Sequence, residues 1–191
     1  CAAQLFAGPG DRGDLITLER KEPMMTVRTG NALGAAACAA LMGYALYAQY
    51  VLELEPCPLC ILQRVAVIVL GVLFLAAALH PAGVVGRRIY ALLLGLVAVA
   101  GSGVAARQVW LTMLPPERVP ACGPGLDFML ESFPLREALS MVLAGSGECA
   151  KVEWRLLGLS MPAWVLIALI GLGAFGVVWN VYASSRSRIS R

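Results

Sequence analysis

The sequence has few charged side chains and a single histidine. Only 14% of its 191 residues are charged and 59% are apolar, a balance far from that of soluble globular domains. Its 15 basic residues form no face interleaved with aromatic side chains, so nucleic-acid binding has little support. The histidine, His80, precedes Pro81 and lies away from the paired cysteines, which argues against a Cys/His nucleophilic hydrolase.

Four apolar stretches are long enough to cross a bilayer as helices, which takes about 20 residues. They cover approximately residues 31–50, 61–79, 89–110 and 162–182. The sequence therefore predicts an all-α membrane protein, a four-transmembrane-helix bundle embedded in the lipid bilayer. We expect a single membrane domain at 29–183, preceded by a polar segment at 1–28 and followed by a basic tail at 184–191.

The positions of the basic residues predict the orientation of the bundle. Arginine and lysine in short flanks are retained on the cytoplasmic side. Such residues precede the first span, join the second to the third, and follow the fourth: Arg20, Lys21, Arg28, Arg87, Arg88, Arg186, Arg188 and Arg191. Both termini are therefore predicted to be cytoplasmic. The long loop at 111–161 then lies on the outer face, and its six acidic residues against four basic ones agree with that side.

The first 24 residues are polar and contain no continuous apolar segment, so they are not typical of a cleavable signal peptide. We interpret them as an extension upstream of a natural start at Met24 or Met25, with the first span acting as the insertion signal. A lipid-modified Cys1 is a weaker alternative, because no signal for that modification is visible in the sequence.

The six cysteines fall into different settings. Cys38 lies inside the first span, where a free cysteine behaves as a small apolar residue. Four others, Cys57, Cys60, Cys122 and Cys149, all map to the predicted outer face. That face is an oxidising compartment, in which disulfides persist. A close pair and a distant pair on one face suggest two redox centres in series.

The close pair is predicted to start a helix, with Cys57 as its cap, Pro58 as its first residue and Cys60 as its third. The unsatisfied backbone N–H groups and the helix dipole favour thiolate there. Arg64 follows Cys60 by four residues, so its guanidinium lies on the same helix face, within reach of the sulfur or of a ligand beside it. The alternative is an arginine that reaches for lipid headgroups.

The distant pair lies in the long outer loop. Cys122 is set among glycine and proline at 121–125, a flexible and exposed setting that another protein could reach. An amphipathic helix is predicted at 135–143, lying on the membrane surface and ending at 145–147, with Cys149 beyond it on a mobile segment.

Two other uses of these cysteines remain open. A plain structural disulfide between Cys122 and Cys149 would stabilise the loop by roughly 3 to 4 kcal/mol. The four thiolates could also bind zinc, but Cys122 and Cys149 are 27 residues apart instead of forming a second tight pair, and an oxidising compartment competes for thiols. We therefore expect no metal.

Several motifs together resemble the DsbB family of bacterial inner-membrane thiol oxidases. They are Glu55-Pro56-Cys57-Pro58-Leu59-Cys60 with Gln63-Arg64, Ala121-Cys122 with Asp127-Phe128-Met129, Ser146-Gly147-Glu148-Cys149-Ala150, and Gly158-Leu159-Ser160-Met161-Pro162-Ala163-Trp164. The similarity covers about residues 25–182. It implies an enzyme that reoxidises a periplasmic thioredoxin-like partner, DsbA, and passes electrons to a membrane quinone, ubiquinone or menaquinone.

The resemblance also implies roles for individual residues. Cys122 would form the mixed disulfide with the partner, and Cys149 would be its loop partner. Cys57 and Cys60 would be the quinone-proximal pair, with Cys60 meeting the quinone and Arg64 assisting. One departure concerns the end of the third span, which reads Trp110-Leu111-Thr112-Met113-Leu114, where several family members have a histidine near the quinone. We expect Arg64 to do more of that work, unless the histidine is dispensable.

Two competing functions remain. A non-enzymatic membrane scaffold with two structural disulfides leaves Arg64 unexplained. Electron flow in the opposite direction, delivering reductant to the outer face, usually needs redox cysteines within the spans or on the cytoplasmic side. The only candidate for that role is Cys38, which is unpaired.

Overall fold

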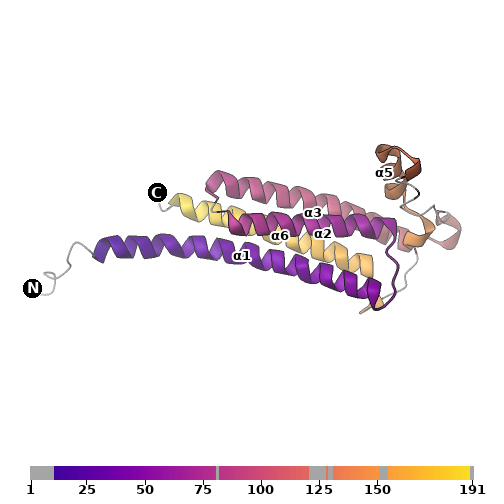
Figure 1. Cartoon of the computed structure of the whole chain (residues 1–191), viewed down its shortest axis with the longest axis horizontal. Helices are drawn as coiled ribbons and strands as arrows, with labels where there is room; N and C mark the ends of the chain where they lie inside the picture. Colours follow the sequence, from indigo (N-terminus) through magenta and orange to yellow (C-terminus); the bar gives the residue numbers. More distant parts are fainter. Residues whose placement is uncertain (1–10, 81, 121–127, 129–130, 151–154, 190–191) are drawn as a thin grey trace, which may run out of the picture.

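Four long helices run side by side and form the body of the protein (Figure 1). The computed structural model describes residues 11–80, 82–120, 128, 131–150 and 155–189. The long helices are α1 (Asp11–Tyr50), α2 (Pro58–Leu79), α3 (Val84–Thr112) and α6 (Met161–Ile189). Helix α3 packs most extensively on α6, and α1 packs on α2. The predicted four-helix architecture is confirmed.

Each long helix contains a segment that is long and apolar enough to cross a membrane. These segments are Val27–Tyr50, Pro58–Leu79, Val84–Thr112 and Met161–Tyr182. The predicted spans agree with them to within a few residues. The largest extension is in α1, which begins at Asp11 and so includes much of the segment that the sequence analysis separated as polar.

Short elements gather beyond one end of the bundle (Figure 1). They are the 3-10 helices η1 (Pro116–Arg118) and η2 (Gly147–Ala150), helix α5 (Leu135–Ala144), and strands β1 (Arg155–Leu156) and β2 (Leu159–Ser160). The two strands pair antiparallel, with Arg155 opposite Ser160 and Leu156 opposite Leu159. Leu157 and Gly158 turn the chain between them, both at positive φ, as a two-residue hairpin requires.

Helix α5 confirms the predicted amphipathic helix between the third and fourth spans. It ends at Gly145, as the sequence indicated. Its apolar side chains divide between two directions. Ala138 and Val142 are buried against the end of the bundle, whereas Leu135 and Leu139 are exposed. Its placement on a membrane surface stays a prediction.

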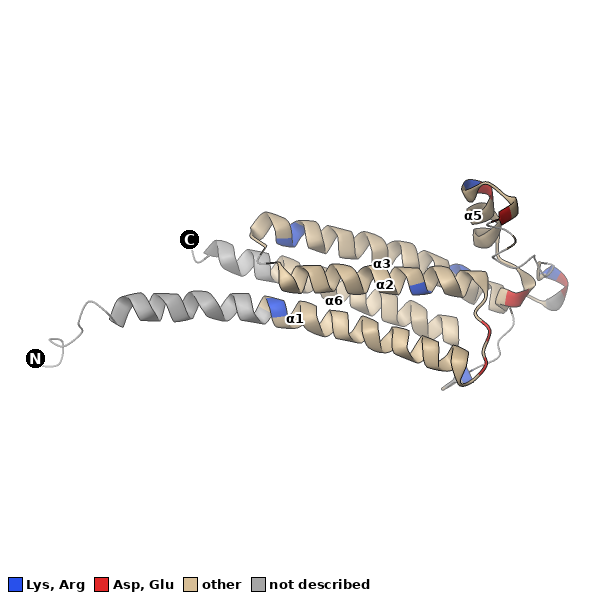
Figure 2. Ribbon diagram, in the orientation of Figure 1, with Lys and Arg blue, Asp and Glu red and all other residues tan. Residues whose placement is uncertain are grey.

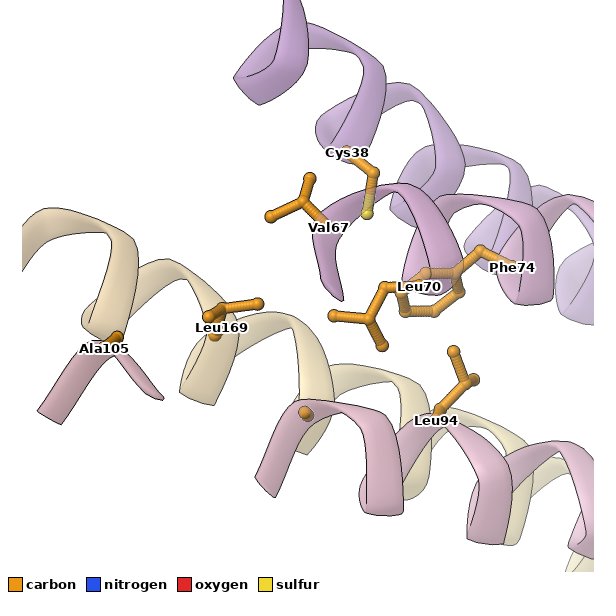
Figure 3. Packing of buried hydrophobic residues seen from close by; sticks show 8 residues of the cluster. Cys38, Val67, Leu70, Phe74, Leu94, Ala105 and Leu169 are labelled. Carbon is orange, nitrogen blue, oxygen red and sulfur yellow. The ribbon is translucent and has the colours of Figure 1, made fainter. Parts of the chain in front are cut away.

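The interior of the bundle is an apolar cluster whose largest fully buried side chain is Phe74 of α2 (Figure 3). Cys38 of α1, Leu94 of α3 and Leu169 of α6 belong to the same cluster. Close approach of α1 to the Phe74 ring depends on Gly34, because a Cβ atom there would lie 2.7 Å from the ring. Cys38 therefore packs as the small apolar residue that the sequence indicated.

The described acidic side chains all lie toward one end of the bundle, whereas basic side chains lie toward both ends (Figure 2). Arg28, Arg87 and Arg88 lie toward the end that carries the turn between α2 and α3, whereas the acidic side chains lie at the opposite end, around α5 and the connection that precedes α2. Arg64 is set apart from both groups, within α2. The cysteine site lies at the end that carries the described acidic side chains, and the same end also carries Arg107, Arg118, Arg136 and Arg155.

Candidate redox site

Cys57 and Cys60 occupy the start of α2 in the arrangement that the sequence predicted. Cys57 is the N-cap residue, with extended backbone angles, and Pro58 is the first helical residue. The Cys57 sulfur accepts a hydrogen bond from the backbone N–H of Cys60 at 3.4 Å, which satisfies one of the free donors of the first turn. The two sulfurs lie 2.9 Å apart, and both cysteines are free.

Cys149 joins this pair from a distant part of the chain. It lies in η2, where its side chain is only 1% exposed, rather than on the mobile segment that the sequence suggested. It shares an apolar cluster with Cys57, Leu59, Leu111 and other side chains at this end of the bundle. The thiol of Cys57 hydrogen-bonds with the sulfur of Cys149. A cysteine of the long loop thus touches the Cys-x-x-Cys motif directly.

The contact between Cys149 and Cys57 divides the charge unequally between them. Hydrogen bonding of the Cys57 thiol, first to Cys149 and then to Cys60, raises the pKa of Cys57, and burial raises it further. The pKa of Cys149 falls from 9.0 to about 6, mainly because Cys57 donates to it and also because Ser146 and Leu59 provide hydrogen bonds that outweigh its burial. The loop cysteine is therefore the one held as thiolate at neutral pH.

Two buried amides form a part of the site to which the sequence analysis gave no role, although Gln63 belongs to one of its motifs. Gln108 of α3 donates from Nε2 to the sulfur of Cys60 at 3.2 Å and to that of Cys57 at 3.3 Å. Its Oε1 accepts a hydrogen bond from Gln63 of α2 at 2.5 Å. The sequence did offer a signal for these two residues: each is an uncharged polar residue inside an apolar span, where polar side chains must find hydrogen-bond partners.

Arg64 lies one turn beyond Cys60 but does not bond to its sulfur. Its guanidinium donates to Oε1 of Gln49 and, at 3.1 Å, to the carbonyl oxygen of Ala45, both on α1. The arginine thus pairs within the bundle, and its role beside a ligand stays a prediction. Its partners on α1 orient it beside a cavity.

A cavity of about 670 Å³ opens beside the cysteines, within the range typical of small-molecule sites. Cys57, Cys60, Gln63, Arg64 and Gln108 contribute to one part of its wall. Apolar side chains of α1 and α6 form most of the remainder. The wall thus offers a few polar groups beside a sulfur and a long apolar surface, which fits an apolar molecule with a polar head. Within the described residues, no cluster of histidine, cysteine and acidic side chains could hold a metal ion.

The structure brings together Cys57, Cys60, Cys149 and Arg64 at one end of the bundle. Cys122, the remaining predicted site residue, lies outside the described residues. Met113, at the stretch where the sequence analysis noted a missing histidine, has a side chain that is 75% exposed. On α3, Gln108 is the residue that contacts the sulfurs.

A multi-span helical protein with a Cys-x-x-Cys pair, a third cysteine in contact with it and an adjoining apolar cavity belongs to the class of membrane thiol–disulfide oxidoreductases. Residues 27–179 match the family described as disulfide bond formation protein DsbB. The chain therefore belongs to the DsbB family.

Individual relatives agree with that assignment. The chain is 54% identical to disulfide bond formation protein B of Methylococcus capsulatus over 157 residues, which cover 81% of this chain and 96% of the relative. It is 51% identical to the protein of the same description from Chromobacterium violaceum, with 86% and 96% covered. For the one from Chromohalobacter salexigens the identity is 57%, with 75% and 84% covered.

Family membership establishes the enzyme class. The chain is a disulfide-forming membrane enzyme, a protein-dithiol:quinone oxidoreductase. The family uses a quinone and a DsbA partner and resides in the bacterial inner membrane. The close approach of Cys57, Cys60 and Cys149 is consistent with redox pairs.

Proposed function

We propose that the chain oxidises a periplasmic DsbA-like dithiol through two cysteine pairs in series, Cys122 with Cys149 and Cys57 with Cys60. Electrons then leave through Cys60 to a membrane quinone, either ubiquinone or menaquinone. The supporting observation is the position of Cys149, whose sulfur contacts Cys57 while Cys60 lines the cavity. A scaffold with two structural disulfides would not need Cys149 of the loop to contact Cys57 of the helix.

The exchange steps balance without any metal. A partner thiolate attacks Cys122 in the Cys122–Cys149 disulfide, so a mixed disulfide forms and Cys149 leaves as thiolate. Cys149 then attacks Cys57 in the Cys57–Cys60 disulfide, which forms a Cys57–Cys149 bond and releases Cys60 as thiolate beside the cavity. The partner's second thiol displaces Cys122, which recaptures Cys149, and Cys57 closes on Cys60 as two electrons leave.

The residues around the cavity fit a quinone. Cys60 would face its ring, and Arg64 would orient a ring oxygen, while the apolar wall from α1 and α6 would hold the tail. When bound, the quinone supplies an acceptor for two electrons and two protons. A strong acceptor is needed, because a DsbA-type couple lies near −120 mV, so reoxidation by a glutathione-like pool near −200 mV would be uphill by roughly 4 kcal/mol.

We also propose that residues 29–183 form one membrane domain with both termini cytoplasmic and the redox cysteines periplasmic. The position of three basic residues in short flanks supports this orientation. Arg28 bonds to the Ala78 carbonyl near the end of α2, and Arg87 and Arg88 lie at the start of α3, all at the end opposite the Cys57–Cys60 pair. The periplasm is oxidising and holds the thioredoxin-like oxidase that the loop would meet.

Anaerobic mixing of the purified chain with a reduced thioredoxin-like dithiol oxidase and a soluble quinone tests the proposal. We expect one quinone reduced per partner dithiol oxidised. Cys60→Ser and Cys122→Ser should abolish the reaction, because each breaks the relay at one pair. Arg64→Ala should slow it, since its guanidinium orients the acceptor.

Cys38→Ala is the matched control, because Cys38 packs in the core and belongs to neither pair. That variant should retain turnover. Full quinone reduction in Cys60→Ser or in Cys122→Ser would exclude the serial relay. An intact chain whose disulfides resist the partner dithiol would favour the scaffold.

A further inference from the structure

The two glutamines beside the cysteines are buried inside an apolar bundle. Gln63 is 3% exposed and Gln108 is 4% exposed. A buried amide without partners would cost free energy, so its bonds determine whether it is tolerated. Gln63 bonds to Gln108, and Gln108 bonds to both sulfurs. No described histidine or carboxylate takes part in these bonds.

The bond from Gln63 fixes which end of the Gln108 amide faces the cysteines. Nε2 of Gln63 donates to Oε1 of Gln108, so the Gln108 oxygen is engaged by a donor and its NH2 group points to the sulfurs. In the dithiol form, the Cys60 thiol can also donate weakly to that oxygen, at 3.6 Å. A reversed amide would place an oxygen against a developing thiolate, which is unfavourable.

We propose that Gln108 is a catalytic residue that donates a hydrogen bond to the Cys60 sulfur as this sulfur becomes a thiolate, and that Gln63 is the positioning residue that orients the Gln108 amide. This inference rests on the proposed function, in which Cys60 is released beside the cavity. The Gln108 N–H stabilises the electron pair that Cys60 receives when the Cys57–Cys60 bond breaks, and no proton is transferred.

The other groups near Cys60 do not provide this donor at the step that needs it. The Cys57 sulfur lies 2.9 Å from that of Cys60, but Cys57 has no thiol proton to donate once it is bonded to Cys149. Arg64 bonds to Gln49 and Ala45 of α1 and makes no described bond to the Cys60 sulfur. Gln108 keeps its donor in every redox state, because an amide neither titrates near neutral pH nor takes part in exchange.

The test measures the reactivity of Cys60 without quinone or partner protein. The full chain carries Cys57→Ala, so that no neighbouring thiol competes, and is reduced with a phosphine in detergent micelles. The alkylation rate of Cys60 at pH 7 is followed by peptide mass spectrometry. Gln108→Met keeps the side-chain shape but removes the amide, and should slow alkylation by about tenfold, because less Cys60 is ionised.

Two further variants separate donation from packing. Gln63→Met should slow Cys60 alkylation by a smaller factor, about threefold, because the Gln108 amide remains but is no longer oriented. Thr112→Val is the matched control, since Thr112 lies one turn further along α3 and its hydroxyl bonds back to Val109. It should leave the rate unchanged.

If the glutamine bonds between α2 and α3 are merely structural, their loss in these variants would lower the thermal midpoint without changing the alkylation rate of Cys60. A Cys60 rate within about twofold of the parent in Gln108→Met would overturn the inference. If Gln108→Met unfolds, Gln63→Met alone decides, and an unchanged rate there contradicts the positioning role. The assay contains no quinone, so failure of quinone turnover in the intact chain would count against the proposed function while the alkylation result stands on its own.

Discussion

At the scale of single residues, Cys149 and Cys57 have opposite acid–base character. Cys57 stays protonated and donates, and Cys149 holds the negative charge. The thiolate is the nucleophile in disulfide exchange, and the most effective attacking thiol has a pKa near the ambient pH. The Cys57 thiol that lowers the pKa of Cys149 exists only while Cys57 is reduced, so this charge distribution belongs to the reduced chain. What serves the proposed relay is the contact itself, which places the sulfur of Cys149 against the sulfur that it attacks.

Site-specific alkylation of reduced Cys149 should follow its pKa of about 6. Below that pH the sulfur is protonated, so the rate should fall about tenfold per pH unit, whereas an ordinary thiol would already lose rate below its pKa of 9.0. Because folding lowers this pKa, ionised Cys149 contributes stability to the reduced chain above pH 9, and that contribution is lost as the pH falls through 6.

Cys57→Ala provides the comparison for that titration. It removes the largest cause of the lowered pKa, so the midpoint for Cys149 should move upward toward that of an ordinary thiol. Burial slows alkylation at every pH and therefore does not shift the midpoint. A wild-type midpoint near 9 would show that the contact with Cys57 does not hold the thiolate.

The residue scale also shows what sequence could and could not predict. The cap at Cys57, the first-turn Pro58 and the helix face of Arg64 depend on spacing within a few residues, so a local pattern sufficed. The contacts of Cys149 and Gln108 with the motif depend on how segments far apart in the chain pack together. No local pattern contains that information.

At the scale of elements, Gly145 sets the position of η2 and therefore of Cys149. It ends α5 with φ +81° and ψ 151°, a region that is essentially restricted to glycine. A Cβ atom at Gly145 would lie 2.4 Å from Cδ1 of Leu111, a side chain that is fully buried. Arg107 holds the same junction, because its guanidinium donates to the Ala144 carbonyl at 3.0 Å and lies over the Trp110 ring.

Gly145→Ala should therefore both destabilise the chain and slow the relay. The backbone strain alone is about 1 to 3 kcal/mol, and the contact with Leu111 adds to it by displacing η2. We expect a lower thermal midpoint in micelles and slower quinone reduction with the partner dithiol.

Gly158→Ala is a control with the same φ of +81° but open space around its Cβ position. It should lower the thermal midpoint by the strain alone and leave the relay rate close to that of the parent. Equal relay rates in the two variants would mean that Gly145 does not position Cys149.

The elements themselves were largely predictable. Hydropathy located the four spans because the bilayer dictates their length and composition, and periodicity located α5 because it alternates apolar and polar faces over a few turns. Hydropathy could not locate the beginning of α1 at Asp11, since a helix can continue beyond the apolar segment. Hydropathy also could not predict that Ala138 and Val142 pack against the end of the bundle.

At the scale of the whole molecule, buried polar groups are concentrated toward the two ends of the bundle, and the apolar Phe74 cluster lies between them. The redox end holds Gln63 and Gln108. Toward the opposite end, Asn31 of α1 and Asn180 of α6 exchange two amide hydrogen bonds, at 3.2 and 3.0 Å. Asn31 lies about 27 Å along α1 from Gln49, the partner of Arg64, at 1.5 Å per residue. The asparagine pair should therefore affect stability without affecting the chemistry.

A double-mutant cycle of Asn31→Ala and Asn180→Ala tests this separation. Either single change removes the partner of the remaining amide on the other helix. The remaining amide still bonds to its own helix, Asn31 to the Val27 carbonyl or Asn180 to the Gly176 carbonyl. Those remaining bonds limit the penalty, so we expect a coupling free energy of about 0.6 to 1.7 kcal/mol, as measured for polar pairs in membrane helices. Unfolding in mixed micelles gives the coupling, and quinone reduction per folded molecule should stay at the parental value in all three variants. A coupling near zero would show that the two asparagines do not bind each other, and a loss of turnover in folded protein would show that the two ends of the bundle are linked.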